Sequence, residues 1–424
     1  MCKSKKKLSK QVMNPSPKPS ATKKPKSTSS SSSSFGPQSS SSSSTISKNY
    51  MNTTPSSSYN FKDASSWQTS SISVSSRTSL SSLRENIIIP EQPHFYDFSE
   101  IRSATNNFLI KPFSSSTSST SWRCTIRNQS VVVIQRKFRR QMDTSEVIDR
   151  LTHICRSHHA SLIKLKGASI SGNYIYLVYE YVQGATLAEC LRNSRNPNFS
   201  ILSTWMSRAQ VALDVAHGLD YIHNSTGLGQ KFVHNHVKSS SIIVTEPNFS
   251  SKMCHFGTAE LCGEMVDNMV QVNQEKQRPD NKFEGTRGYI SPEYRTTGIS
   301  TPKTDVYAFG VVILELLSGE EPLRYIFDRG GKGYLRKSVI EGAREAVGGG
   351  GVRRWVDKRL KDSYPVEVVE KMVKLGLECV EEDPNERPGM GKVVGRISQM
   401  YLESQNWSEK MGTPLDLTMS LGPR

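Results

Sequence analysis

This sequence of 424 residues lacks long hydrophobic runs and closely spaced cysteine pairs, and it has few acidic side chains near the N-terminus. No stretch reaches the ~18 consecutive apolar residues that a membrane-spanning helix needs, so we expect none. The basic N-terminus has no apolar segment behind it, and we expect no secretory signal. The seven cysteines form no C-x-x-C pair. This usage is typical of reduced thiols in a cytosolic or nuclear protein.

Acidic side chains are nearly missing from residues 1–86, which hold two of them against 13 basic ones. This segment therefore supplies +11 of the formal net charge of +16. The rest of the chain is close to balanced, which argues against a basic nucleic-acid groove in a folded domain, and we expect no specific nucleic acid as partner.

The same segment is rich in serine, with runs at 29–34 and 39–44, and has few apolar anchors. It cannot bury enough apolar surface to offset its conformational entropy, so we predict a disordered tail over residues 1–92. From about residue 93 the mixture of apolar and charged residues is that of a folded domain.

The tail has three possible roles, which the sequence leaves open. Cys2 lies beside a lysine cluster, and S-acylation there would combine with the basic charge to hold the tail at an anionic membrane. The cluster Lys23-Lys24-Pro25-Lys26 would also suit a nuclear import signal. The third reading is a solubilising linker that can be phosphorylated. We expect a cytoplasmic protein, peripheral at the plasma membrane, with a nuclear location as the alternative.

The apolar periodicity of the body predicts strands first and helices after them. Ser99 is expected to cap a short helix, and a hairpin is expected over 121–137. A second strand pair is expected around 174–179. Helices are predicted over 143–155, 202–223, 305–317, 339–347 and 366–380. This order indicates an α+β fold with a small β-rich N-lobe and a larger helical C-lobe.

Six sequence blocks in this body resemble the protein kinases, and specifically the plant receptor-like (cytoplasmic) kinases. They include L-V-Y-E-Y-V-Q-G-A-T-L at 177–187, G-T-R-G-Y-I-S-P-E-Y at 285–294 and T-D-V-Y-A-F-G-V-V-I-L-E-L-L-S-G at 304–319. The L-T-H-I stretch at 151–154 is further similar to the LysM-type receptor kinases. The resemblance implies a two-lobed kinase-like domain over 93–402, with an N-lobe at about 113–181, a C-lobe at about 184–402 and a C-terminal tail over 403–424.

The resemblance implies a glycine-rich phosphate loop, but serines stand at its positions. Counting back from Trp122, the three glycines fall on Ser114, Ser116 and Ser119. Side chains here would obstruct the close approach of the backbone to phosphate.

The family motif V-A-I-K aligns with residues 132–135, which places Gln135 at the phosphate-binding lysine. Val133 then stands where alanine is usual and would crowd an adenine ring. Arg136 is expected to point away, because side chains alternate between the faces of a strand. Glu146 is the nearest candidate for the glutamate that pairs with that lysine. The other adenine-site candidates are Glu180, Val182 and Ile243.

The catalytic loop and the metal-binding motif have also changed. The loop H-R-D-x-K-x-x-N reads as residues 234–241, in which Asn235 replaces the arginine, His236 the base and Ser241 the metal-binding asparagine, while Lys238 is retained. The motif D-F-G begins with His255. Magnesium prefers oxygen ligands, so imidazoles at 236 and 255 are the wrong donors for it.

Residues with architectural roles in the family are present. The resemblance implies that His234 stacks with Phe256 in an internal spine, that Gly257 completes its motif, and that Asp305 braces the catalytic loop. It also implies an ion pair between Glu293 and Arg387. The fold is thus expected to survive where the chemistry is lost.

We therefore predict a pseudokinase that acts as a scaffold or allosteric partner of an active receptor-like kinase or another signalling protein. No cofactor is required, and ATP binding stays an open alternative. The rival hypotheses are an active or weakly active ATP-dependent Ser/Thr kinase with displaced catalytic groups, and an adaptor that associates with membrane or nucleic acid through its basic tail. His153, Cys155, His158 and His159 have zinc-like spacing, but we interpret them as ordinary helix-end and loop residues.

Overall fold

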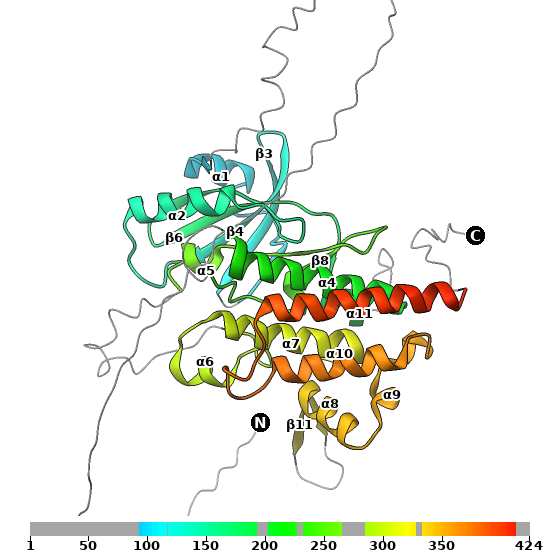
Figure 1. The fold of residues 1–424 in the computed structure, drawn as a ribbon. Coiled ribbons are helices and arrows are strands. Elements are labelled where there is room, and N and C mark those ends of the chain that lie inside the picture. The colour runs from blue at the N-terminus through cyan, green and yellow to red at the C-terminus, as the bar shows by residue number, and fades with distance from the viewer. Residues whose placement is uncertain are drawn as a thin grey trace, which may run out of the picture. The chain divides into compact units, whose positions relative to one another are not determined.

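The computed structural model describes residues 93–116, 118–192, 202–226, 232–264, 285–327 and 333–412. The predicted disordered tail with Cys2, and the end of the predicted C-terminal tail after 412, lie outside these residues. In the described part, strands form an upper lobe and helices a lower one, as Figure 1 shows.

Six strands form the sheet of the upper lobe, in the order β1-β5-β6-β4-β3-β2. Their bounds are β1 His94–Phe95, β2 Ser114–Ser115, β3 Ser119–Ile126, β4 Gln129–Lys137, β5 Leu165–Ser171 and β6 Tyr174–Glu180. Helix α1 (Phe98–Ala104) and helix α2 (Thr144–Arg156) accompany this sheet. Strand β4 is central to the site, because its two faces contribute to two separate apolar clusters.

Helix α1 begins two residues earlier than predicted. Its N-cap is Asp97, whose Oδ1 accepts a hydrogen bond from Ser99 N at 2.9 Å, so the expected Ser99 cap is wrong. A carboxylate here satisfies an N–H group at the positive end of the helix dipole, which a hydroxyl at 99 could not do from inside the first turn. Phe108 still packs with the aromatic rings above the sheet.

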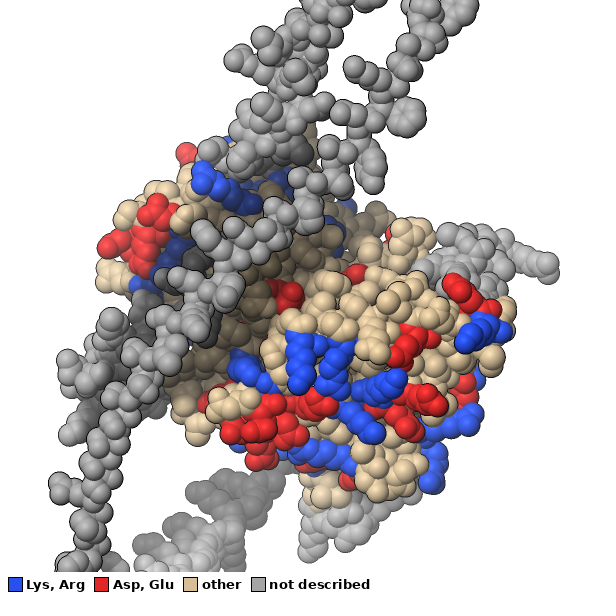
Figure 2. All heavy atoms as spheres, in the orientation of Figure 1, with Lys and Arg blue, Asp and Glu red and all other residues tan. Residues whose placement is uncertain are grey.

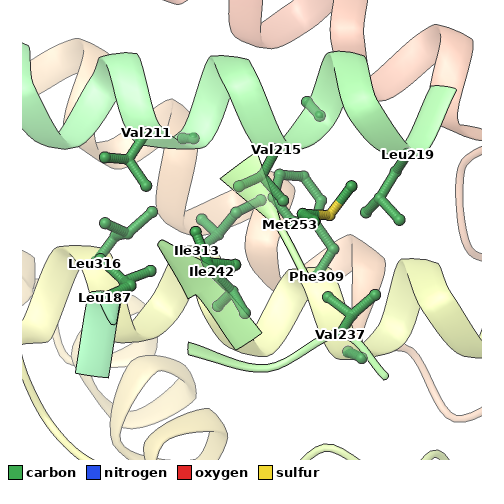
Figure 3. Close-up of a cluster of buried hydrophobic side chains, with 14 of the residues drawn as sticks. Leu187, Val211, Val215, Leu219, Val237, Ile242, Met253, Phe309, Ile313 and Leu316 are labelled. Carbon is green, nitrogen blue, oxygen red and sulfur yellow. The ribbon is translucent and has the colours of Figure 1, made fainter. Parts of the chain in front are cut away.

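The lower lobe is built on two long buried helices. Helix α4 (Trp205–Asp220) continues into a π-helical turn, and helix α7 (Pro302–Ser318) is buried along nearly its whole length. Figure 3 shows Val211 and Val215 of α4 facing Ile313 of α7, with Met253 between them. This contiguous core holds the loops of the site in place.

The remaining elements surround this core. They are β7 Ala185–Thr186, α3 Leu187–Arg192, β8 Ile242–Val244, β9 Ser251–Met253, α5 Thr258–Leu261, α6 Pro292–Thr297, β10 Leu323–Phe327, β11 Tyr334–Ser338, α8 Val339–Gly348, α9 Val352–Trp355, α10 Val366–Cys379 and α11 Met390–Lys410. None of the described helices combines the length and the apolar character needed to cross a membrane.

The last helix moves the predicted domain boundary. Helix α11 continues past residue 402 to Lys410, and Trp205 Nε1 donates a hydrogen bond of 2.8 Å to Ser404 Oγ. Ser404 and Ser408 are buried, so the folded domain includes this end of the helix. The predicted boundary at 402 is therefore wrong. The sequence prediction contained no helix over 390–410, so it gave no sign that the domain extends to Lys410.

Candidate functional site

A cavity of about 160 Å³ lies where the kinase resemblance places the phosphates and the catalytic loop. The segments that meet there include the β2–β3 turn, β4, residues 235–238, the start of the segment after β9, residues 285–294 and helix α7. Its lining includes Ser116, Ser118, Ser119, Arg136, Asn235, His236, Lys238, His255 and Thr286. The wall is thus mostly hydroxyl, amide and cationic groups.

The predicted phosphate loop forms the β2–β3 turn, and serine hydroxyls tie it together. Ser114 pairs with Ser121 across the hairpin, and Ser116 N donates to Ser119 O at 2.8 Å. The hydroxyls of Ser116 and Ser119 are 3.0 Å apart. These side chains stand in the space that glycines would leave open.

The structure reverses the predicted roles of Gln135 and Arg136. Gln135 Nε2 donates to Tyr176 Oη at 3.0 Å on the face of the sheet covered by α1. Arg136 is buried on the opposite face, where it lines the cavity and donates to Ser118 Oγ at 3.3 Å. Arg136 therefore occupies the position expected for the lysine. Side chains alternate between the faces of β4 as predicted, but the alignment that placed the lysine at position 135 is displaced by one residue.

The adenine-site prediction shifts with it. Val133 is buried in the cluster under α1 and cannot meet a ligand in the cleft, so that prediction is wrong. Ile134 has the cleft-side parity and fills the place where alanine was expected. Val182 and Ile243 pack against the main core. None of these side chains lines the cavity.

Glu180 contacts Lys164 and Lys252. Its Oε1 accepts a hydrogen bond from Lys164 N at 3.3 Å and lies 3.5 Å from Lys252 Nζ. It lines a second cavity, of about 290 Å³, with these lysines. The side chain therefore faces away from the cavity that holds the catalytic loop.

The residue that organises the site is Glu264, which the sequence analysis did not identify. It follows α5 in the activation segment and is buried. Its carboxylate pairs with Arg136, lies 3.0 Å from His236 Nε2 and accepts a hydrogen bond from Asn235 Nδ2 at 3.2 Å. A carboxylate from the activation segment thus joins the lysine position of β4 to the base position of the catalytic loop.

This arrangement sets the charge state of the cluster. Burial alone would raise the pKa of Glu264, but His236 and Arg136 hold that pKa well below its ordinary value. The carboxylate is therefore ionised near neutral pH and balances the cations around it. It already accepts hydrogen bonds from Arg136 and Asn235 and lies against the His236 imidazole, which leaves little capacity for a metal ion or a phosphate's counter-ion.

The predicted degenerate residues of the catalytic loop adopt new contacts. Asn235 accepts a hydrogen bond from Ser300 Oγ at 2.7 Å, in addition to its contact with Glu264. Lys238 Nζ donates to Thr286 Oγ1 at 3.1 Å. Ser241 Oγ is buried, and within the described part of the chain it has no hydrogen-bond partner.

The donor set does not suit Mg²⁺. His255 and His236 present imidazoles with ring centroids 5.8 Å apart, and the carboxylate nearest them is Glu264. Among the described residues, no group of three or more His, Cys, Asp or Glu side chains is arranged to hold a metal ion, and this includes the zinc-like set at 153–159. Magnesium requires near-octahedral oxygen ligands, which these residues cannot supply.

Asp305 holds the catalytic loop from helix α7. Its carboxylate accepts hydrogen bonds from His234 N at 2.7 Å and Asn235 N at 2.8 Å, and it lies 3.0 Å from His223 Nε2. Burial acts to raise the pKa of Asp305, but the contacts with His223 and the backbone hold it below its ordinary value. The charge is therefore kept, and the loop is fixed to the core.

Glu293 and Arg387 are also joined. Arg387 Nη1 and Nη2 each lie 2.7 Å from a carboxylate oxygen of Glu293, a bidentate pair. Arg387 also donates to Glu381 O at 2.8 Å and Lys303 O at 3.0 Å. The pair ties α6 to the segment before α11.

The implied stacking of His234 on Phe256 is replaced by other contacts. Phe256 packs against Phe232 with ring centroids 6.0 Å apart, and His234 lies edge-on to His236. Tyr179 Oη donates to Phe256 O at 2.8 Å and so holds the backbone of this motif. Gly257 adopts φ 80°, and a Cβ there would collide with Ile154 of α2, so this position requires glycine.

Helix α2 is oriented by other ion pairs. Glu146, the candidate partner of the β4 cation, binds Arg140 and Arg150 at 2.6 Å each. Arg150 also pairs with Glu260 of α5. Helix α2 is thus linked to the activation segment, and Glu264 takes the role of partner to Arg136.

Two histidines of the site, the buried His234 and the partly buried His255, predict a pH-dependent stability. Burial lowers the pKa of His234 from 6.5 to about 4 and that of His255 well below 6.5. At pH values below 6.5 but above the folded-state pKa of each histidine, the unfolded chain binds protons that the folded chain does not. The free energy of unfolding therefore falls as pH falls. We expect up to about 1.4 kcal/mol per pH unit from each histidine.

Urea unfolding at several values from neutral to about pH 5 measures this slope. The variant His255→Gln should show a shallower slope, because one of the two groups no longer titrates. His94→Gln, an exposed histidine at β1, is the matched control and should leave the slope unchanged. An equal slope in wild type and His255→Gln would contradict the prediction.

Comparisons with known proteins agree with this architecture. A family model described as protein tyrosine and serine/threonine kinase matches residues 118–397. "LysM domain receptor-like kinase 3" of Arabidopsis thaliana is 31% identical over 324 residues, which are 75% of this chain and 48% of that protein. "Chitin elicitor receptor kinase 1" of the same organism is 34% identical over 270 residues, 62% of this chain and 40% of that protein.

A solved structure is also similar, that of the pseudokinase domain of BIR2, described as an immune regulator of the RLK/Pelle family. It has a TM-score of 0.57 and 24% sequence identity, and the match covers 78% of this chain and 97% of that one. This likeness concerns the fold. The chain spans about half the length, or less, of the first curated relatives that it matches.

Proposed function

This chain belongs to the protein tyrosine and serine/threonine kinase family, and we propose that it is a pseudokinase of the receptor-like kinase type. It would act by binding other signalling proteins and would transfer little or no phosphate. The observation that carries this proposal is the buried cluster of Glu264, Arg136 and His236, which joins the lysine position to the base position of the cleft.

The chemistry of phosphoryl transfer supports the proposal. The reaction needs positioned phosphates, two metal ligands and a base for the substrate hydroxyl. His236 and His255 replace carboxylates, and Ser241, whose Oγ is buried, does not line the cavity. The loss of a general base alone costs about 10²–10⁴ in rate. Here the base and both metal-binding positions are changed together.

The intact framework supports a role in binding. Asp305 and the Glu293–Arg387 pair keep the catalytic loop and α6 in place although the chemistry they would serve is lost. A rigid lobe is what a scaffold or allosteric partner requires. We propose an active receptor-like kinase, or another signalling protein, as partner, and a cytoplasmic protein that the basic tail holds at the plasma membrane or directs to the nucleus.

The rival function is a weakly active Ser/Thr kinase, which one observation favours. Lys238, the retained residue of the catalytic loop, still lines the cavity and contacts Thr286. In that case nucleotide and a divalent metal would bind together, and Lys238 would be needed for phosphate transfer.

Thermal unfolding with ATP separates the two functions. We expect no rise in Tm that depends on Mg²⁺ or Mn²⁺, because imidazoles stand at positions 236 and 255 and Glu264 already neutralises Arg136. Lys238→Ala serves as the matched variant. A metal-dependent rise in wild type that is lost in Lys238→Ala would contradict the proposal and support the rival.

A further inference from the structure

The β10–β11 hairpin exposes apolar side chains on both of its faces. Cross-strand neighbours share a face of a two-stranded ribbon. One face carries Tyr325, Phe327 and Tyr334, and the opposite face carries Ile326 and Leu335. Their exposed fractions lie between 46% for Ile326 and 71% for Tyr334. A contiguous exposed patch of this kind marks an interaction site, whereas a single exposed apolar residue does not.

The aromatic side chains are arranged and not merely exposed. Phe327 and Tyr334 pair across the strands with ring centroids 5.5 Å apart in an edge-to-face geometry. Such a contact is a favourable one for aromatic rings and pre-orders the surface. The base of the hairpin is anchored, because Val339 N donates to Pro322 O at 3.1 Å beside α8. The ribbon runs outward from that base (Figure 1).

Basic side chains surround this patch. The two described strands carry Arg324, Arg336 and Lys337 and no carboxylate. Lys337 and Trp355 both lie against Gly342 of α8, which brings α9 beside the hairpin. The exposed cations on α9 and after it are Arg353, Arg354, Lys358 and Lys361. Figure 2 shows Lys and Arg atoms interspersed with Asp and Glu atoms at the lower right of the lobe, near the place of α9 in Figure 1.

Acidic neighbours neutralise this basic surface only in part. Glu320 pairs with Arg324, Glu345 lies 3.3 Å from Lys337, and Asp362 lies 3.3 Å from Arg353. All three pairs are at least partly exposed to solvent, where ion pairs are weak and do not cancel the attraction to a strongly anionic partner. The hairpin and α9 therefore present aromatic and cationic groups together.

We propose that the β10–β11 hairpin docks onto an anionic membrane surface. A protein with a flat face would cover one side of the ribbon and leave the apolar residues of the other side in water. The lipid interface surrounds an inserted ribbon and covers both sides. Aromatic rings are favoured at the level of the lipid headgroups, and the flanking Arg and Lys attract anionic headgroups.

The depth of insertion is limited by the backbone. A two-stranded ribbon has two open edges, whose N–H and C=O groups require water or headgroups as partners. The hairpin is therefore placed in the interfacial zone, with the aromatic rings as anchors and the cations at the headgroups. A second copy of the chain would instead bring two basic hairpins together, and like charges oppose that contact.

Vesicle binding of the full chain tests the proposal. The probes are vesicles of phosphatidylcholine alone and vesicles with about 30% phosphatidylserine. We expect wild type to partition to the anionic vesicles and to gain hydrogen-exchange protection over 323–327 and 333–338. The triple variant Tyr325→Ser, Phe327→Ser, Tyr334→Ser should lose about tenfold or more in partition and lose the protection. The variant Arg336→Glu, Lys337→Glu should lose about tenfold.

The control variant is Leu109→Ser, Leu402→Ser, which removes two exposed leucines away from the hairpin and should change neither readout. All variants keep the basic tail, so its attraction to the vesicles is the same in each. No vesicle-dependent protection of the hairpin, with unchanged partition in the triple variant, overturns the proposal. Self-association that the triple variant abolishes, without any effect of vesicles, also overturns it and assigns the hairpin to a second copy.

Discussion

Replacing Glu264 with alanine is expected to lower the free energy of unfolding by about 3–5 kcal/mol. Glu264 is buried, and its carboxylate pairs with the buried Arg136 and with His236. Removing one member of a buried ion pair leaves the desolvated charge of the other uncompensated. Chemical denaturation of wild type and variant measures the difference.

A double-mutant cycle shows whether the loss comes from the pair. The variant Arg136→Met, Glu264→Met should lose less than the sum of the two single variants, by about 0.5–3 kcal/mol. The control is Glu146→Gln, which weakens the partly exposed contacts to Arg140 and Arg150 and should cost less than about 1 kcal/mol. Additive losses at 136 and 264 would contradict the structure of the cluster.

Glu264→Ala is also expected to bind an anionic ligand in the cavity. In Glu264→Ala the cations at 136 and 238 still line the cavity, and Arg136 has lost the carboxylate that pairs with it. Inorganic pyrophosphate should therefore raise the Tm of Glu264→Ala and leave that of wild type unchanged. Equal stabilisation of both would mean that Glu264 does not occupy the place of an anionic ligand.

Replacing Arg387 with methionine is expected to cost a similar amount, about 3–5 kcal/mol. Its guanidinium is buried, binds both carboxylate oxygens of Glu293 and donates to three backbone carbonyls. Methionine can fill part of the volume but offers none of these donors. Denaturation in urea would measure the loss.

The matched control is Arg396→Met on helix α11. Arg396 also binds a glutamate with two nitrogen atoms, but both side chains of its pair with Glu378 are partly exposed to solvent. We expect a loss of less than about 1 kcal/mol there. If the two variants lost equal stability, burial would not be the reason for the strength of the Glu293–Arg387 pair.

The fold could be predicted from the sequence because many residues carried the same information. The two-lobed α+β kinase-like architecture and the membership of the kinase family are confirmed. Most predicted helices agree with the structure to within a few residues, since their apolar spacing follows the helical period. Glu293 and Arg387 form the ion pair that the resemblance implies, because the framework that positions them is kept.

The site could be predicted only at positions that align with the kinase motifs. The apolar run Val131–Ile134 contains no alternation, so it could not reveal which side chains face the cleft, and Gln135 was exchanged with Arg136. Glu264 gave no signal at all. It lies in an irregular segment, and its partners come from β4 and the catalytic loop, so only the tertiary structure brings them together.

Incorporation of labelled phosphate measures whether the protein transfers phosphate, which the pseudokinase proposal denies. Full-length protein is incubated with ATP labelled at the γ-phosphate, with Mg²⁺ or Mn²⁺ and with a general protein substrate, beside the Lys238→Ala variant. We expect no incorporation above the protein-free background in either protein, because the base and metal-binding positions hold His236, Ser241 and His255. Metal-dependent incorporation by wild type that Lys238→Ala abolishes would contradict it.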